Sequence, residues 1–163
     1  MAKYPLQQLM EIKLKRLEEA ERELAKRKEE LEAEEKKLQI EIDKLQTILD
    51  HKAEKMAQMR LEMDQGTTTD KIKQMKSYLE TIEDKRKIQD DKVKKQKLEV
   101  EKAEVAVEDA RQNMFQKQAD VEKLKMHREE WDSEQLYLEK QEEAKETEEM
   151  GTSMHVRKKK RGK

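Results

Sequence analysis

Histidine and carboxylate side chains are the groups in this sequence that could do chemistry, so their spacing is considered first. The three histidines, His51, His127 and His155, are far apart along the chain. The segment His127-Arg128-Glu129-Glu130 lacks the second histidine that a zinc-protease helix requires. The chain also has no cysteine, no phosphate-binding glycine loop and no nucleophile elbow. We therefore predict that the protein is not an enzyme, with no catalytic residue, no metal site and no cofactor.

The composition favours a binding protein built on helices. Of 163 residues, 47% are charged and only 33% are apolar, which is too little apolar surface for a globular core. The chain must therefore be disordered, or its apolar residues must lie along one helical seam. No apolar run is long enough to span a bilayer or to form a signal peptide, and the lack of cysteine fits a reducing compartment. These features predict a cytoplasmic protein without an integral membrane segment.

Heptad repeats decide between these two possibilities in favour of helices. In the first part of the chain the d positions are Met10, Leu17, Leu24, Leu31, Leu38, Leu45 and Met59, and apolar a positions are Leu14, Ile42, Leu49, Met56 and Met63. In the second part a second heptad includes Ile72, Met75, Leu79, Ile82, Val93, Val100, Ala103, Val107, Ala110, Met114, Val121, Leu124, Trp131 and Leu138. So regular a pattern is not that of a disordered chain.

The two heptads are out of phase across Gly66-Thr67-Thr68-Thr69-Asp70. Gly66 is suited to end one helix, and Thr67 with Asp70 resembles a capping box that opens the next. We predict an antiparallel two-helix coiled-coil hairpin over residues 1–150. Its first helix spans about 5–65 and starts at Pro5, its turn spans 66–69, and its second helix spans about 70–150. Residues 151–163 are predicted to form a disordered basic tail.

A continuous helix in a parallel dimer is the alternative architecture. It is disfavoured because Met63 and Ile72, both a positions, are nine residues apart, and because Glu21, Lys28 and Glu35 would each face their own copy. Two registers of the hairpin are possible. The preferred one sets Leu31 against Val107 and Leu45 against Val93, but also Lys52 against Arg86. A slip of one heptad avoids that charge clash and sets Leu14 on Lys117 and Leu45 on Arg86.

Exposed aromatic residues are the candidate partner contacts of this hairpin. Tyr78 lies one position off the seam near the turn, where it should be partly exposed. In the preferred register the open end brings together Tyr4, Leu6, Leu9, Trp131 and Tyr137, which is more apolar surface than two helices can cover. Net charge is −1 with both signs interspersed, so we predict no nucleic-acid partner despite the basic tail.

Four short motifs give the chain a resemblance to a known family. They are Lys3-Tyr4-Pro5-Leu6, Gly66-Thr67-Thr68, Lys76-Ser77-Tyr78-Leu79-Glu80-Thr81-Ile82-Glu83 and His127-Arg128-Glu129-Glu130-Trp131. Together with the two-helix plan, they make the chain resemble the central stalk and chaperone-escort proteins of type III secretion, the YscO and FliJ family. The resemblance is closest to chlamydia-like members.

The resemblance implies a hairpin similar to the γ subunit of rotary ATP synthases. Its partners would be a hexameric export ATPase, the cytoplasmic domain of the export gate and secretion chaperones. Residues Tyr78 and Ile82 would contact the gate, whereas Tyr4, Leu6, Trp131 and Tyr137 at the open end would contact the ATPase. The protein would be cytoplasmic, peripheral to the inner-membrane secretion apparatus, and a monomer in isolation.

Two other functions are also compatible with the sequence. One is a generic coiled-coil scaffold or spacer without an ATPase partner. The other is a binder of nucleic acid or membrane surfaces that uses the basic segment Arg157 to Lys163.

Overall fold

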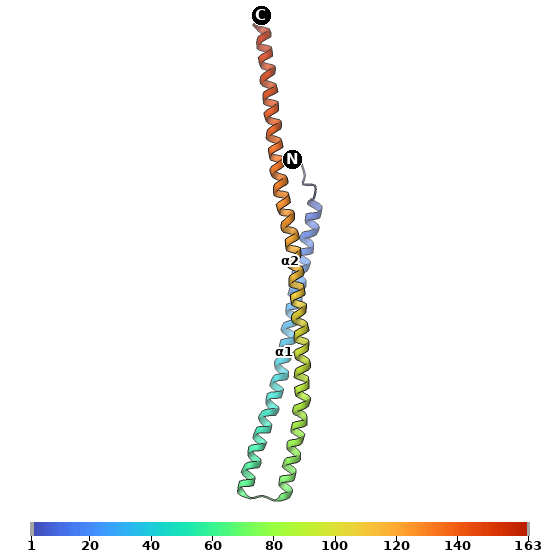
Figure 1. Cartoon of the computed structure of the whole chain (residues 1–163), viewed down its shortest axis with the longest axis vertical. Coiled ribbons are helices and arrows are strands. Elements are labelled where there is room, and N and C mark those ends of the chain that lie inside the picture. Colours follow the sequence, from blue (N-terminus) through green and yellow to red (C-terminus); the bar gives the residue numbers. More distant parts are fainter. Residues whose placement is uncertain (1, 163) are drawn as a thin grey trace. The chain divides into compact units, whose positions relative to one another are not determined.

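The computed structural model describes residues 2–162 of the chain. Within that range it contains two helices and no strands, α1 (Gln7–Gln65) and α2 (Thr69–Arg161). Figure 1 shows the chain reversing between them. The predicted all-α helical hairpin is therefore confirmed. The structure divides into two units, Arg22–Gln112, which includes the turn, and residues 2–21 with 113–162. In each unit a stretch of α1 packs against a stretch of α2.

The turn is built by one glycine and one threonine. Gly66 has a φ of 90°, which L residues with a side chain adopt at a cost, and its N–H donates to the Met63 carbonyl oxygen at 3.4 Å. The Thr68 carbonyl accepts the first helical bond of α2 from Ile72, and the Thr68 hydroxyl accepts from the Lys71 N–H at 3.4 Å. The helix cap is therefore Thr68, one residue later than the predicted Thr67, and the loop is 66–68.

The start of α1 also differs from the prediction. The Gln7 N–H donates to the Tyr4 carbonyl at 3.2 Å, so Pro5 occupies the second position of a turn. The Met10 N–H donates to the Leu6 carbonyl at 2.9 Å. As a result α1 begins at Gln7 and not at Pro5. The turn directs Tyr4 back toward α2, where its side chain is only 6% exposed.

The α2 face of the seam agrees with the predicted heptad. All buried residues of α2 fall at predicted a and d positions, and they are Ile82, Gln89, Val93, Val100, Val107, Ala110 and Val121. Burying apolar side chains of this kind stabilises a fold by about 1.5–3 kcal/mol each. The only polar member is Gln89, which is 6% exposed and makes hydrogen bonds through its amide.

The α1 face is rotated by about one position from the prediction. The d residues face α2, with Met10 and Leu24 buried and Leu31 half-buried. Most of the predicted apolar a residues lie instead on an exposed flank, with exposed fractions of 36–49%, and they are Leu14, Ile42, Leu49 and Met63. The seam is completed by the residues one position earlier, which include Ala20, Glu34, Glu41 and Ile48.

Two polar layers account for this rotation and for the register. The Gln89 Nε2 donates to the Glu41 carbonyl at 2.9 Å and to its carboxylate, and Gln96 does the same with Glu34 at 3.0 Å. A glutamine in the seam needs such partners, because an unpaired buried amide costs about 1–3 kcal/mol. These contacts fit the register slipped by one heptad, in which Gln89 lies next to Ile42. The preferred register was therefore wrong.

A disordered tail was predicted at 151–163, but the structure has helix over most of this segment; residue 163 lies outside the described residues. The helix continues through Gly151 to Arg161. A glycine inside a helix costs only about 1 kcal/mol, so it does not end the helix by itself. The last turn contains Lys158, Lys159, Lys160 and Arg161, whose positive charge interacts favourably with the negative end of the helix dipole.

Candidate binding surfaces

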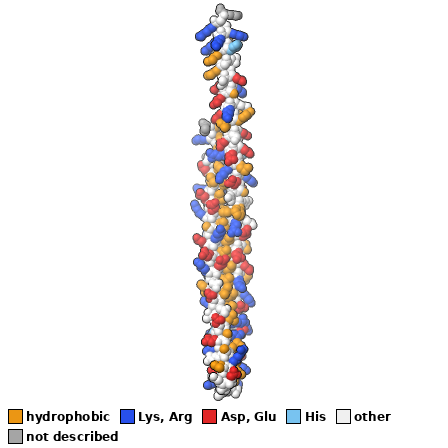
Figure 2. Space-filling view, turned by 90° about the vertical axis from the view of Figure 1, so that its left-hand side faces the viewer, with side chains coloured by type: hydrophobic (Ala, Val, Ile, Leu, Met, Phe, Trp, Pro, Cys, Tyr) orange, Lys and Arg blue, Asp and Glu red, His pale blue; other side chains and the backbone are white. Residues whose placement is uncertain are grey.

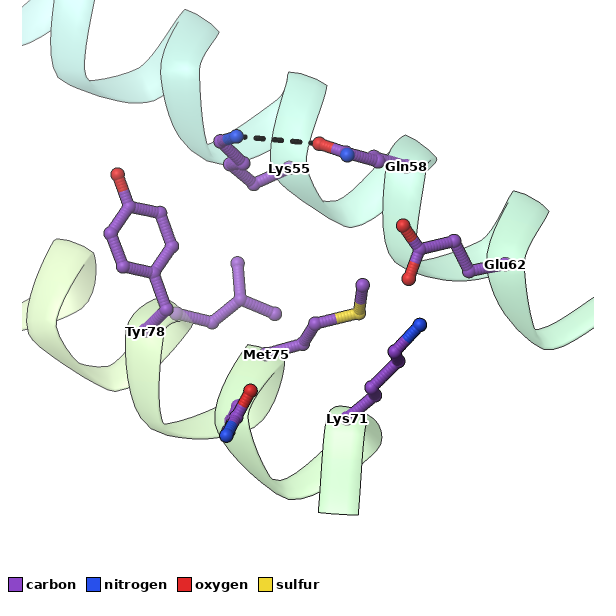
Figure 3. Close-up of a pocket in the computed structure, with 8 residues that line it drawn as sticks. Lys55, Gln58, Glu62, Lys71, Met75 and Tyr78 are labelled. Atoms are coloured by element: carbon purple, nitrogen blue, oxygen red, sulfur yellow. Dashed lines mark hydrogen bonds between the residues drawn. The ribbon is translucent and has the colours of Figure 1, made fainter. Parts of the chain in front are cut away.

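A groove close to the turn forms the first candidate binding surface, which we call the turn-side groove. It has a volume of about 340 Å³ and takes residues from both helices: Lys55, Gln58, Glu62, Lys71, Gln74, Met75, Tyr78 and Leu79. Figure 3 shows Tyr78 and Met75 on α2, facing Lys55, Gln58 and Glu62 on α1. Apolar side chains between charged neighbours suit contact with a protein surface.

Tyr78 is the exposed aromatic residue of this groove. Its side chain is 46% exposed, which confirms the predicted partial exposure. Its hydroxyl lies 2.8 Å from His51 Nε2, and the two rings meet edge to face with centroids 5.9 Å apart. The ammonium of Lys55 lies 5.8 Å from the Tyr78 ring centroid, within cation–π range. Tyr78 is thus held in place by α1 while its ring stays accessible.

Sequence reasoning did not find His51 or Lys55 as part of this surface. Both lie on α1, and only the helix register brings them beside Tyr78. Ile82, the second predicted gate contact, is 4% exposed. It packs in the seam one turn after Tyr78, so Tyr78 and Ile82 do not share an accessible surface in this structure.

A charge cluster follows the groove along α2. The Glu83 carboxylate accepts from Lys52 Nζ at 2.6 Å and from Arg86 Nη2 at 2.7 Å. Hydrogen bonds from Arg86 and then from Lys52 lower the pKa of Glu83 to about 2, against the opposing effect of desolvation. The preferred register had placed Lys52 directly against Arg86. In the structure the Glu83 carboxylate forms an ion pair with each of these two cations.

The second candidate surface is an aromatic cluster in the unit of residues 2–21 and 113–162, which we call the Tyr4 cluster. The Tyr4 hydroxyl lies 2.6 Å from His127 Nδ1. Its ring meets the Trp131 ring edge to face at 5.5 Å, and the Arg128 guanidinium lies 5.7 Å from the Tyr4 centroid. The N-terminal segment is therefore fastened to α2 through one tyrosine.

The four predicted open-end contacts differ in accessibility. Tyr4 is buried, Leu6 and Trp131 are half-buried, and Tyr137 is 62% exposed. A second groove of about 420 Å³ runs beside Trp131, and it is lined by Ala2, Arg128, Trp131, Asp132, Gln135, Leu136 and Glu139. Tyr137 and the exposed edge of Trp131 are therefore available to a partner, whereas Tyr4 holds the cluster together.

The described residues contain no arrangement for metal chemistry. No group of three or more histidine, aspartate or glutamate side chains within residues 2–162 could hold a metal ion. Neither helix, over the residues that the structure describes, has a segment long and apolar enough to cross a membrane. Both candidate sites are surfaces on which aromatic and charged side chains lie together.

These features define an all-α helical hairpin with an exposed aromatic residue in each of two candidate surfaces. A family model described as YscO-like protein matches residues 1–161. The chain therefore belongs to the YscO-like family, which places it in the context of type III secretion. A solved structure described as a YscO homolog from Chlamydia trachomatis is similar to it, with 33% sequence identity and a TM-score of 0.92. That match covers 98% of this chain and 99% of the other. A comparison with curated proteins gave no match.

Proposed function

We propose that this protein is a non-enzymatic stalk or adaptor of a type III secretion export ATPase complex. In this role it links the ATPase to the cytoplasmic domain of the export gate and escorts secretion chaperones. The proposal is carried by one observation: Tyr78, in the family-like motif after the turn, is held by His51 and Lys55 with its ring exposed. A tyrosine fixed in this manner can bind a partner at a small cost in conformational entropy.

The proposal assigns the two surfaces to different partners. The turn-side groove around Tyr78 contacts the gate, and Ile82 supports it from the seam beneath. The exposed part of the Tyr4 cluster, with Leu6, Trp131 and Tyr137, contacts the ATPase. The protein then acts in the cytoplasm, peripheral to the inner membrane.

Reciprocal alanine variants test this assignment. Tyr78→Ala should weaken binding to the purified cytoplasmic domain of the gate by about thirtyfold, the loss expected of an aromatic anchor worth about 2 kcal/mol. It should leave ATPase binding and helix content unchanged. Tyr137→Ala, the matched control, should weaken ATPase binding and leave gate binding unchanged. Interferometry on immobilised full-length chain measures both affinities, and circular dichroism measures helix content.

Two results would contradict the proposal. If Tyr78→Ala unfolds the protein, the division between seam and surface is wrong. If the wild-type chain neither binds the hexameric ATPase nor changes its rate of ATP hydrolysis, a scaffold or spacer without an ATPase partner is the better description.

A further inference from the structure

The last part of α2 has no helix packed against it. Every residue that the structure describes from Leu136 onward is exposed. The apolar seam ends at Leu138, because the next a and d positions of α2 are polar: Glu142, Lys145, Glu149 and Thr152. We call residues 139–161 the C-terminal arm. At about 1.5 Å per residue it forms roughly 35 Å of helix that contributes nothing to the core of the hairpin.

The charges of the C-terminal arm are separated into two blocks. Residues 139–149, the acidic block, contain six glutamates and two lysines. Residues 157–161, the basic block, read Arg157-Lys158-Lys159-Lys160-Arg161. In Figure 2 basic side chains gather at the C-terminal end of α2. The arm is therefore acidic first and basic at its end.

The two blocks of one arm cannot neutralise each other. Glu149 and Arg157, at the facing ends of the blocks, are about 12 Å apart along the helix axis. Among the residues of the arm, all of which the structure describes, no ion pair forms. In the packed hairpin, by contrast, opposite charges three or four residues apart pair on the same helix, as Arg27 does with Glu23 at 2.9 Å.

One face of the arm carries both kinds of charge with an apolar centre. Met150 and Met154 are 67% and 66% exposed, and their spacing of one turn puts them on the same face. They border a shallow groove together with Glu146, Glu149, Ser153 and Arg157. Steps of three and four residues keep to one helical face, and they extend this one to Glu143, Thr147, Arg157 and Arg161.

Two copies of this face are complementary when the arms lie antiparallel. Such an arrangement can set Met150 of one copy against Met154 of the second copy. Seven residues farther out on each arm, Glu143 then lies opposite Arg161 of the second copy. The arrangement has a twofold axis, so each contact occurs twice. Parallel arms in register would instead set each block against its own copy, and like charges facing each other are unfavourable.

We propose that the C-terminal arm is a self-association surface, through which two chains pair antiparallel with their methionines at the centre. A second copy is the occupant because one chain carries both halves of the complementary surface. A nucleic acid fits less well, since its uniform negative charge would repel the acidic block. Contacts between exposed charges are individually weak, so the dimer forms at high concentration and dissociates on dilution. The inference does not depend on the export ATPase or the gate.

A charge-swap experiment on the full-length chain tests the inference. One variant reverses the acidic block (Glu143→Lys, Glu146→Lys, Glu149→Lys). The other reverses the basic block (Arg157→Glu, Lys158→Glu, Lys160→Glu, Arg161→Glu). The control reverses three exposed glutamates of the packed hairpin (Glu54→Lys, Glu101→Lys, Glu104→Lys). Sedimentation equilibrium over a range of concentrations measures the mass against the monomer value of 19.6 kDa, and circular dichroism follows helix content.

Each single-block variant alone should self-associate at least about tenfold more weakly than wild type, because its two arms then present like charges to each other at both ends. An equimolar mixture of the two variants should form dimers again, since a basic arm then meets an acidic one. High salt should weaken wild-type dimers. The control should associate within about twofold of wild type, the change expected of exposed charges outside an interface.

Three results would overturn the inference. The first is a wild-type chain that remains a monomer at concentrations up to about 1 mM. The second is a single-block variant that dimerises as well as the control, which would place the self-association surface elsewhere. The third is an equimolar mixture that remains monomeric, because the arms then do not recognise each other's charge. Binding of DNA by a wild-type chain that stays monomeric would assign the basic block to a nucleic acid instead.

Discussion

Several individual side chains of this hairpin form hydrogen bonds between the two halves of the chain. Tyr78 of α2 pairs with His51 of α1, and Tyr4, which precedes α1, pairs with His127 of α2. Gln89 and Gln96 each donate to a carbonyl and a carboxylate across the seam. None of these partners is close in sequence. The exposure of Tyr78 could be predicted from its heptad position, but His51 could not be found, because its proximity depends on the register.

Glu83 should make the stability of the hairpin depend on pH. Its pKa is lowered to about 2 in the folded protein from an ordinary value of 4.5. A carboxyl group whose pKa is lower in the folded state stabilises the fold above the unfolded pKa, and the stabilisation is lost as pH falls from about 4.5 to about 2. Hydrogen bonds from Gln96 and Gln89 lower the pKa values of Glu34 and Glu41 in the same direction.

The substitution Glu83→Gln isolates this contribution. It should lower the melting temperature at pH 7, where the carboxylate binds Lys52 and Arg86, and have much less effect at pH 2. Thermal unfolding followed by circular dichroism across this range measures the difference. Glu80→Gln, one turn earlier on the same helix and exposed, is the control. An equal loss at both pH values would mean that Glu83 acts through packing rather than charge.

At the scale of the helices, α2 was predicted better than α1. The buried residues of α2 follow its heptad because nearly all of them are apolar, so burial alone selects that face. In α1 the apolar residues offered two neighbouring faces. The choice was made by Gln89 and Gln96, which need Glu41 and Glu34 opposite them. A heptad pattern is assigned from apolar residues alone. It does not indicate which face of a helix supplies a hydrogen-bond partner to a polar residue in the seam.

Two glycine substitutions of opposite effect test the backbone conformation of the turn and of the C-terminal part of α2. Gly66→Ala should destabilise the protein by about 1 kcal/mol, because φ is 90° there although no atom lies within 4 Å of the added Cβ. Gly151→Ala should stabilise the C-terminal part of α2 by about 0.5–1 kcal/mol, because the surroundings of Gly151 are equally open and its backbone is helical. Urea unfolding measures the first and helix content measures the second. If Gly151→Ala leaves helix content unchanged, α2 does not continue through residue 151 as a helix in solution.

At the scale of the whole molecule, Gly66 and the phase break between the two heptad repeats were enough to predict the hairpin. They were not enough to predict its register. Both registers join leucines to valines, so apolar pairing nearly balances between them. The polar layers break that balance, since a slip to the preferred register would move Gln89 away from Glu41. A register fixed in this way also fixes which α1 residues lie beside Tyr78, and hence the turn-side groove.

Cysteine cross-linking can determine the register in solution. The sequence has no cysteine of its own, so only the introduced pair can form a disulfide. The glutamine layers place Leu31 in the same layer as Val100, and one heptad, about 10 Å, from Val107. A disulfide requires Cα atoms within about 7 Å. The pair Leu31→Cys with Val100→Cys should therefore oxidise readily, and the pair Leu31→Cys with Val107→Cys should not. The opposite result would establish the other register and separate His51 from Tyr78, which would remove the basis for the turn-side groove.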